Sequence, residues 1–161
     1  MKKRYIRFIF IIYLIALARI IVFKYPIDIL KAIASEWSDE VFWEGLGNAN
    51  FELFRTINLY TTHWNMREIH SFSNLIGNVL IFIPMGFLLP QISSKTKNFF
   101  VCIIGFLLVI LGIEFFQLYT AFGVFDVDDI VLNLTGAIIG NIFYLVLRII
   151  CGNKKLQTRR R

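Results

Sequence analysis

The amino-acid sequence predicts an all-α integral membrane protein: a bundle of four transmembrane helices with an outer amphipathic helix and loop. Its 161 residues are 57% hydrophobic and 17% charged, whereas about a quarter of the residues in a soluble domain are charged. The apolar residues form blocks close to the roughly 20 residues that a helix needs to cross a bilayer. Between the blocks, basic segments without acidic residues alternate with segments rich in Asp and Glu. We therefore expect one membrane domain over residues 1–161.

Four apolar blocks are the expected transmembrane helices, at about residues 5–23, 72–89, 98–119 and 129–150. The first block follows a basic start, as the apolar region of a signal peptide does. It ends in lysine, tyrosine and proline at positions 24–26, which is not the small-residue cleavage site of a signal peptide. We expect this block to stay in the membrane as a helix.

The longest connecting segment, residues 24–71, is expected on the outer side. Residues 27–44 place apolar side chains at helical spacing, which predicts an amphipathic helix. This helix is expected either to lie on the membrane surface or to pack against the bundle. Because its polar face is acidic, attraction to anionic lipid is not expected, and packing against the bundle is favoured. Residues 51–60 alternate in part and predict a short strand or an extended segment. His63 and His70 lack a third ligand, so surface or core roles are favoured over metal binding.

The charge distribution predicts the orientation of the chain in the membrane. The segments 1–7, 90–97 and 151–161 hold eleven basic residues and no acidic residue, whereas segments 24–71 and 120–128 hold nine acidic residues. Basic segments stay on the cytoplasmic side of a membrane. Both termini are therefore expected in the cytoplasm, and the net charge of +6 is explained without a nucleic-acid partner.

Each predicted helix carries polar residues near its outer end, and together they form one layer. The layer consists of Arg19, Asn74, Asn78, Glu114, Gln117, Asp129 and Asn133. All lie within about 10 Å of the outer boundary at 1.5 Å per helical residue. Pairs three or four residues apart share a helical face, which predicts an acidic, amide-lined pocket open to the outside. The alternative is a hydrogen-bonded network that only holds the helices together.

The charged members of this layer suggest specific roles. An intramembrane carboxylate such as Glu114 is a functional-site candidate by default. Arg19 is expected either to pair with Glu114 or Asp129 or to extend to the outer interface. Asp126, Asp128 and Asp129 would cap the last helix or hold a divalent cation that bridges to a phosphate, although their spacing is a loose metal pattern.

Two smaller features concern packing and redox state. Gly136 and Gly140 have the spacing that lets two membrane helices approach closely, so we expect a packing role. Cys102 and Cys151 both fall near the cytoplasmic side, where thiols stay reduced. We expect no disulfide.

Several ordered motifs resemble a known family. They are segments 50–57, 74–78, 82–86, 114–117 and 126–129, followed by Asn133, Gly136 and Gly140. In this order they are similar to the signature blocks of VanZ-like membrane proteins, and the resemblance covers most of residues 50–145. Two positions depart from the family pattern: Leu53 stands where a proline is usual, and Gly123 where an arginine is frequent. The second departure weighs against a mechanism that needs a basic group in that loop.

The resemblance implies low-level resistance to teicoplanin-type glycopeptide antibiotics without remodelling of the cell-wall precursor. It does not imply a mechanism. The chain shows no nucleophile with a partnered base, no phosphate-binding glycine loop and no ATPase motif. An energy-driven pump is therefore not expected from this polypeptide alone.

Two hypotheses remain for the mechanism. In the first, the outer pocket engages a membrane lipid, a lipid-linked cell-wall precursor or the lipoglycopeptide. In the second, the protein is an enzyme that modifies a lipid-linked envelope component, with Glu114 or Asp129 as general base or metal ligand. The sequence does not identify a cofactor, and a divalent cation is the one candidate. The residues expected to bind are Arg19, Asn74, Asn78, Glu114, Gln117, Asp126, Asp129 and Asn133.

Overall fold

The structure is a computed structural model that describes residues 3–21, 25–62 and 69–158, with side chains described for residues 3–21, 25–59 and 75–151. The described backbone is helical apart from its turns and one isolated parallel bridge between Asn50 and Asp126. This confirms the all-α prediction.

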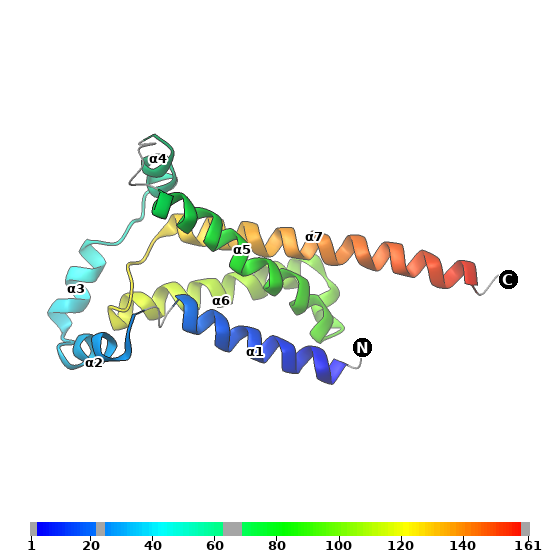
Figure 1. The fold of residues 1–161 in the computed structure, drawn as a ribbon, viewed down its shortest axis with the longest axis horizontal. Coiled ribbons are helices and arrows are strands. Elements are labelled where there is room, and N and C mark those ends of the chain that lie inside the picture. Colours follow the sequence, from blue (N-terminus) through cyan, green and yellow to red (C-terminus); the bar gives the residue numbers. More distant parts are fainter. Residues whose placement is uncertain (1–2, 22–24, 63–68, 159–161) are drawn as a thin grey trace.

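The helices are, in chain order, α1 (Lys3–Ile21), α2 (Ile27–Ser35), α3 (Asp39–Gly47), α4 (Arg55–Thr62), α5 (Ile69–Ile92), the 3-10 turn η2 (Lys95–Lys97), α6 (Phe99–Thr120) and α7 (Val127–Thr158). Four long helices, α1, α5, α6 and α7, form the bundle (Figure 1). The short helices α2, α3 and α4 all lie at one end, which we call the loop end. Helix α1 begins and α7 ends at the opposite end, which we call the terminal end.

Three helices in the described part are long and apolar enough to cross a membrane: α5 over Leu75–Ile92, α6 over Phe99–Thr120 and α7 over Val127–Cys151. Helix α1 has 19 residues but is less uniformly apolar. Its basic residues are Lys3, Arg4, Arg7 and Arg19. Three membrane-capable helices support a membrane protein, and a fourth span stays a prediction.

Helices α5 and α7 pack against each other along much of their length, and glycines make this possible. A Cβ on Gly136 would lie 2.0 Å from the carbonyl oxygen of Val79, and one on Gly140 would lie 2.0 Å from that of Ile83. Gly86 approaches α7 equally closely from the α5 side. Only glycine permits such backbone contact, so the predicted packing role is confirmed.

The interior of the bundle is a small apolar core. It consists of Leu17, Phe82, Met85, Cys102, Phe106, Ile110 and Ala137. Cys102 and Cys151 are free thiols, as predicted. Large apolar side chains such as Leu80, Leu108 and Phe143 are exposed on the outside of α5, α6 and α7. Water would solvate such a surface poorly, whereas lipid would cover it.

The outer segment differs from the prediction in two places. The single amphipathic helix predicted for residues 27–44 is two helices, α2 and α3. The break occurs because the Ser38 hydroxyl accepts a hydrogen bond from the Val41 N–H at 3.3 Å and caps a new helix there. The strand or extended segment predicted for residues 51–60 is also wrong, because α4 occupies Arg55–Thr62.

Other predictions about the chain ends and histidines have mixed outcomes. Helix α7 continues to Thr158, so most of the predicted tail 151–161 is helical. Position 63 lies outside the described residues, and the side chain of His70 does as well. The prediction of surface or core roles for these histidines therefore stays untested.

One contact supports packing of the outer segment on the bundle. The Trp37 indole N–H donates to the carbonyl oxygen of Tyr119 at 2.6 Å, and the two rings lie 5.3 Å apart. Trp37 lies between α2 and α3, whereas Tyr119 lies in the last turn of α6. The segment thus contacts the end of α6.

Candidate functional site

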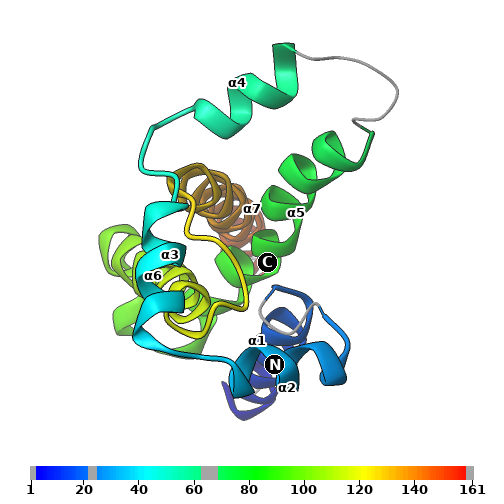
Figure 2. The same cartoon turned by 90° about the vertical axis from the view of Figure 1, so that its left-hand side faces the viewer.

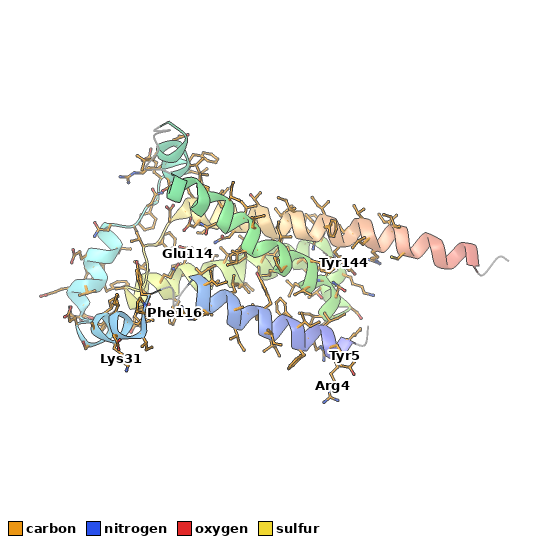
Figure 3. All side chains as sticks on the ribbon, viewed as in Figure 1. Arg4, Tyr5, Lys31, Glu114, Phe116 and Tyr144 are labelled. Atoms are coloured by element: carbon orange, nitrogen blue, oxygen red, sulfur yellow. The ribbon has the colours of Figure 1, made fainter. Side chains whose placement is uncertain are left out.

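Polar side chains gather at the loop end, where residues 50–57 lie beside the start of α7. Figure 2 shows the backbone of this region. Glu114, labelled in Figure 3, lies in the second half of α6 and is only 1% exposed. Its Oε2 accepts a hydrogen bond from the backbone N–H of Asp126 at 3.2 Å. This contact joins α6 to the start of α7.

Asp126 caps α7 and fastens the crossing segment at the same time. Its Oδ1 accepts from the backbone N–H of Asp128 at 2.8 Å, which is N-cap geometry, and from the Asn50 amide at 2.8 Å. Its Oδ2 accepts from the Thr56 hydroxyl at 2.7 Å. Both carboxylate oxygens are therefore engaged by donors from the protein.

The buried carboxylate of Asp128 caps a different helix, α4. It accepts hydrogen bonds from the backbone N–H groups of Phe54 at 2.5 Å, Thr56 at 2.7 Å and Ile57 at 3.2 Å. These donors lie at the start of α4, where the first N–H groups of a helix lack partners within it. An anion is also favoured there by the helix dipole.

Backbone hydrogen bonds fix the same junction. The Asn50 N–H donates to the Phe125 carbonyl oxygen at 2.8 Å, and the Val127 N–H donates to that of Asn50 at 3.0 Å. The Asn50 side-chain oxygen accepts from the Glu52 N–H at 3.1 Å. Residues 50–57 are therefore held against the start of α7 by both backbone and side chains.

Two further contacts link the remaining bundle helices. Asn78 of α5 donates through its amide to Oδ1 of Asp129 in α7 at 2.6 Å. Gln117 of α6 donates to the carbonyl oxygen of Ile21 at the end of α1 at 3.2 Å. The predicted polar layer thus connects all four long helices at the loop end.

Asparagine side chains in α7 supply unpaired acceptors. Asn133 lies one turn after Asp129 on the same helix face, and it is buried. Among the residues that the structure describes, its Oδ1 has no hydrogen-bond partner, and neither does Oδ1 of the buried Asn141, two turns further on. Most buried polar atoms in proteins are paired, so these two atoms call for an explanation.

The structure brings together most of the residues predicted to bind. We give the name polar network to two adjoining groups: Asn50, Thr56, Glu114, Asp126 and Asp128, which hydrogen bonds join, and the pair of Asn78 and Asp129, which lies next to them at the start of α7. Gln117 and Asn133 adjoin it on α6 and α7, and Arg19 is exposed on α1. The side chain of Asn74 lies outside the described residues. Prediction missed Asn50 and Thr56 as members, and their only signal was that segment 50–57 resembles the family's loop.

The predicted divalent-cation site at Asp126, Asp128 and Asp129 does not appear in this arrangement. Within the described ranges, no group of three or more His, Cys, Asp and Glu side chains is placed to hold a metal ion. The first two carboxylates instead accept hydrogen bonds from N–H and O–H donors. Asp129 accepts one from Asn78.

Comparison with known proteins agrees with the resemblance seen in the sequence. The family model described as VanZ/LLP1 matches residues 10–148. Protein VanZ from Enterococcus faecium is 32% identical over 105 residues, which are 64% of this chain and 61% of that relative. The match thus spans less than two thirds of the relative's length. No solved structure matches this protein. Because the family model covers nearly the whole helical bundle, the chain belongs to the VanZ/LLP1 family.

Proposed function

We propose that this protein is a multi-pass membrane protein that confers low-level resistance to teicoplanin-type glycopeptide antibiotics. In this proposal the polar network engages a membrane lipid, a lipid-linked cell-wall precursor or the drug itself. Membership of the VanZ/LLP1 family supports the resistance role. The observation that carries the site is Glu114, a carboxylate buried within a membrane-capable helix, since such carboxylates are usually functional.

The distribution of charge over the fold supports a bundle with four spans and cytoplasmic termini. At the terminal end, the Lys3 ammonium lies 3.5 Å from the Ser94 hydroxyl. Lys95 and Lys97 follow directly in η2. The acidic first turn of α3, with Asp39 and Glu40, lies at the loop end. Basic residues remain in the cytoplasm, so the loop end is the outer end in this proposal.

We assign ligand contact to three members of the network, Glu114, Asp129 and Asn78, and to the adjoining Asn133. The carboxylates of Asp126 and Asp128 are held by protein donors at the starts of α7 and α4, and this gives them a structural role. The unpaired Oδ1 of Asn133 is an acceptor that a ligand or a water molecule can satisfy. The enzymatic alternative has no observation in its favour.

The proposal is tested by expressing the protein in a teicoplanin-susceptible bacterium. Wild-type protein should raise the inhibitory concentration of teicoplanin severalfold more than that of a glycopeptide without a lipid tail. Glu114→Gln should abolish this effect at an unchanged membrane protein level, because the amide keeps the size but not the charge. The matched control is Glu52→Gln, since this side chain is exposed.

Two results would contradict the proposal. One is an unchanged teicoplanin response on expression of the wild-type protein. The other is full resistance from Glu114→Gln, which would remove the site while leaving the resistance role. The orientation has its own test, because a reporter that is active only outside the cytoplasm should be inactive when fused after Arg161.

A further inference from the structure

The turn that leads into α4 exposes apolar side chains. Phe51, Leu53 and Phe54 are 61%, 50% and 47% exposed, although they lie beside the hydrogen-bonded carboxylates of the polar network. Turns on a water-exposed surface are usually polar. An apolar turn of this kind indicates contact with something other than water.

This turn is held in a fixed conformation. Phe54 has a φ of 65°, in the left-handed region that a bulky side chain adopts at a cost. The Asp128 carboxylate accepts from the N–H groups of Phe54 and Thr56, and these hydrogen bonds hold the strained residue. Asp126 binds Asn50 at the other end of the turn. The exposure of the apolar side chains is therefore imposed by the fold.

A ladder of aromatic rings joins the turn to a membrane-capable helix. The Phe51 ring lies 5.3 Å from Phe125, and Phe125 lies 5.7 Å from Phe115 of α6. Phe125 is buried between the other two rings, whereas Phe115 is 58% exposed. The apolar surface of the turn is thus continuous with the outer surface of α6.

That surface of α6 is the one expected to face lipid. Ile104, Leu108 and Phe115 are exposed at helical spacing, whereas Glu114 belongs to the buried face. Phe115 follows Phe99 by 16 residues, or about 24 Å along the helix. Since the hydrocarbon core is about 30 Å thick, this places Phe115 near its outer boundary. The ladder then leads from that boundary into the headgroup region.

We propose that Phe51, Leu53 and Phe54 lie in the interfacial region of the membrane and contact lipid acyl chains there. Aromatic side chains concentrate at this depth in membrane proteins. Arg55, exposed directly after the turn, can reach lipid phosphate groups while its stem stays among apolar groups. The turn thereby anchors the loop end in the membrane, and this anchoring role is independent of the resistance function.

The test measures the surroundings of the turn with a nitroxide spin label. Leu53→Cys is labelled in a Cys151→Ser background, because Cys102 is buried, and is reconstituted in phosphatidylglycerol and cardiolipin vesicles. Power saturation compares accessibility to oxygen, which partitions into lipid, with accessibility to a water-soluble nickel complex. Leu108→Cys serves as the lipid-facing reference and Asn48→Cys as the polar, exposed control.

The label at position 53 should resemble the label at position 108. Its ratio of oxygen accessibility to nickel-complex accessibility should be severalfold above the ratio measured at position 48. A ratio equal to that at position 48 would overturn the proposal, because the turn would then lie in water. Low accessibility to both reagents would also overturn it, since this indicates coverage by protein, including a second copy of the chain. If Leu53→Cys does not fold, a spin label on Phe51→Cys measures the accessibility of the same surface.

Discussion

The Asp128 carboxylate accepts a hydrogen bond from the backbone N–H of Thr56 at 2.7 Å, although Asp128 follows Thr56 by 72 residues. Asp128 itself lies in the first turn of α7. The negative charge of one buried carboxylate therefore lies at the N-terminal ends of both α4 and α7. Helix dipoles favour a negative charge at both places. The position of α4 at the loop end therefore depends on a residue that is remote in sequence.

The first prediction concerns this carboxylate. Asp128→Asn should lower the free energy of unfolding by about 1–3 kcal/mol, because one acceptor oxygen and the charge are lost among buried N–H donors. Thermal unfolding in detergent or nanodiscs measures the change. Glu52→Gln, at an exposed carboxylate, should change stability by about 0.5 kcal/mol or less. Equal effects of the two variants would show that Asp128 does not stabilise α4.

The second prediction concerns the pair Asn78 and Asp129, whose amide and carboxylate lie 2.6 Å apart. Asn78→Asp should lower both stability and resistance, because two carboxylates would then face each other. The exchanged double variant, Asn78→Asp with Asp129→Asn, should recover much of the loss, since it restores one amide and one carboxylate. A coupling energy of about 1–3 kcal/mol is expected for a hydrogen bond to a charged group.

The recovery in the double variant is the decisive comparison. Thermal unfolding and the inhibitory concentration of teicoplanin are measured for the wild type, both single variants and the exchanged pair. Additive losses in the double variant would contradict a direct interaction between these two side chains.

How far the sequence predicts this fold depends on the range of the interactions involved. The long helices were predictable because a membrane requires continuous apolar blocks, and the block predicted at 98–119 is α6 at Phe99–Thr120. Helix α4 was not predictable from residues 51–60, since its first N–H groups are capped by a carboxylate from α7. Local pattern carries no information about such a distant partner.

The residues of the candidate site also divide into those that the local sequence pattern predicts and those that only the fold brings together. Glu114 and Asp129 were found because a carboxylate within an apolar block is unusual. Thr56 was missed because a threonine in a polar segment is ordinary, and only the fold brings it to Asp126 at 2.7 Å. The structural roles of Asp126 and Asp128 also required the fold, because the same three aspartates suit a helix cap and a metal site equally well in sequence.

The third prediction concerns the glycine contact between α5 and α7. Gly140→Ala should destabilise the protein by about 1–3 kcal/mol, because its Cβ would lie 2.0 Å from the backbone oxygen of Ile83. Gly112→Ala in α6 is the matched control, since nothing lies within 4 Å of a Cβ there. That control should be neutral or up to about 1 kcal/mol more stable, as alanine favours helix. Thermal unfolding checks both variants, and equal stability of the two would contradict close packing at Gly140.

The last prediction separates stability from function at the two asparagines with unpaired carbonyl oxygens, Asn133 and Asn141. An unsatisfied buried polar atom costs about 1–3 kcal/mol, and replacing it by an apolar group of similar shape removes this cost. Asn133→Leu should therefore match or exceed the wild type in thermal stability. Asn141→Leu also loses a hydrogen bond to Cys102, so its stability should lie within about 1 kcal/mol of the wild type. Their effects on resistance should differ, because Asn133 lies one turn from Asp129 in the candidate site, whereas Asn141 contacts Cys102 deeper in the bundle. Asn133→Leu should abolish the rise in teicoplanin inhibitory concentration and Asn141→Leu should retain it, so full resistance from a stable Asn133→Leu variant would exclude Asn133 from ligand binding.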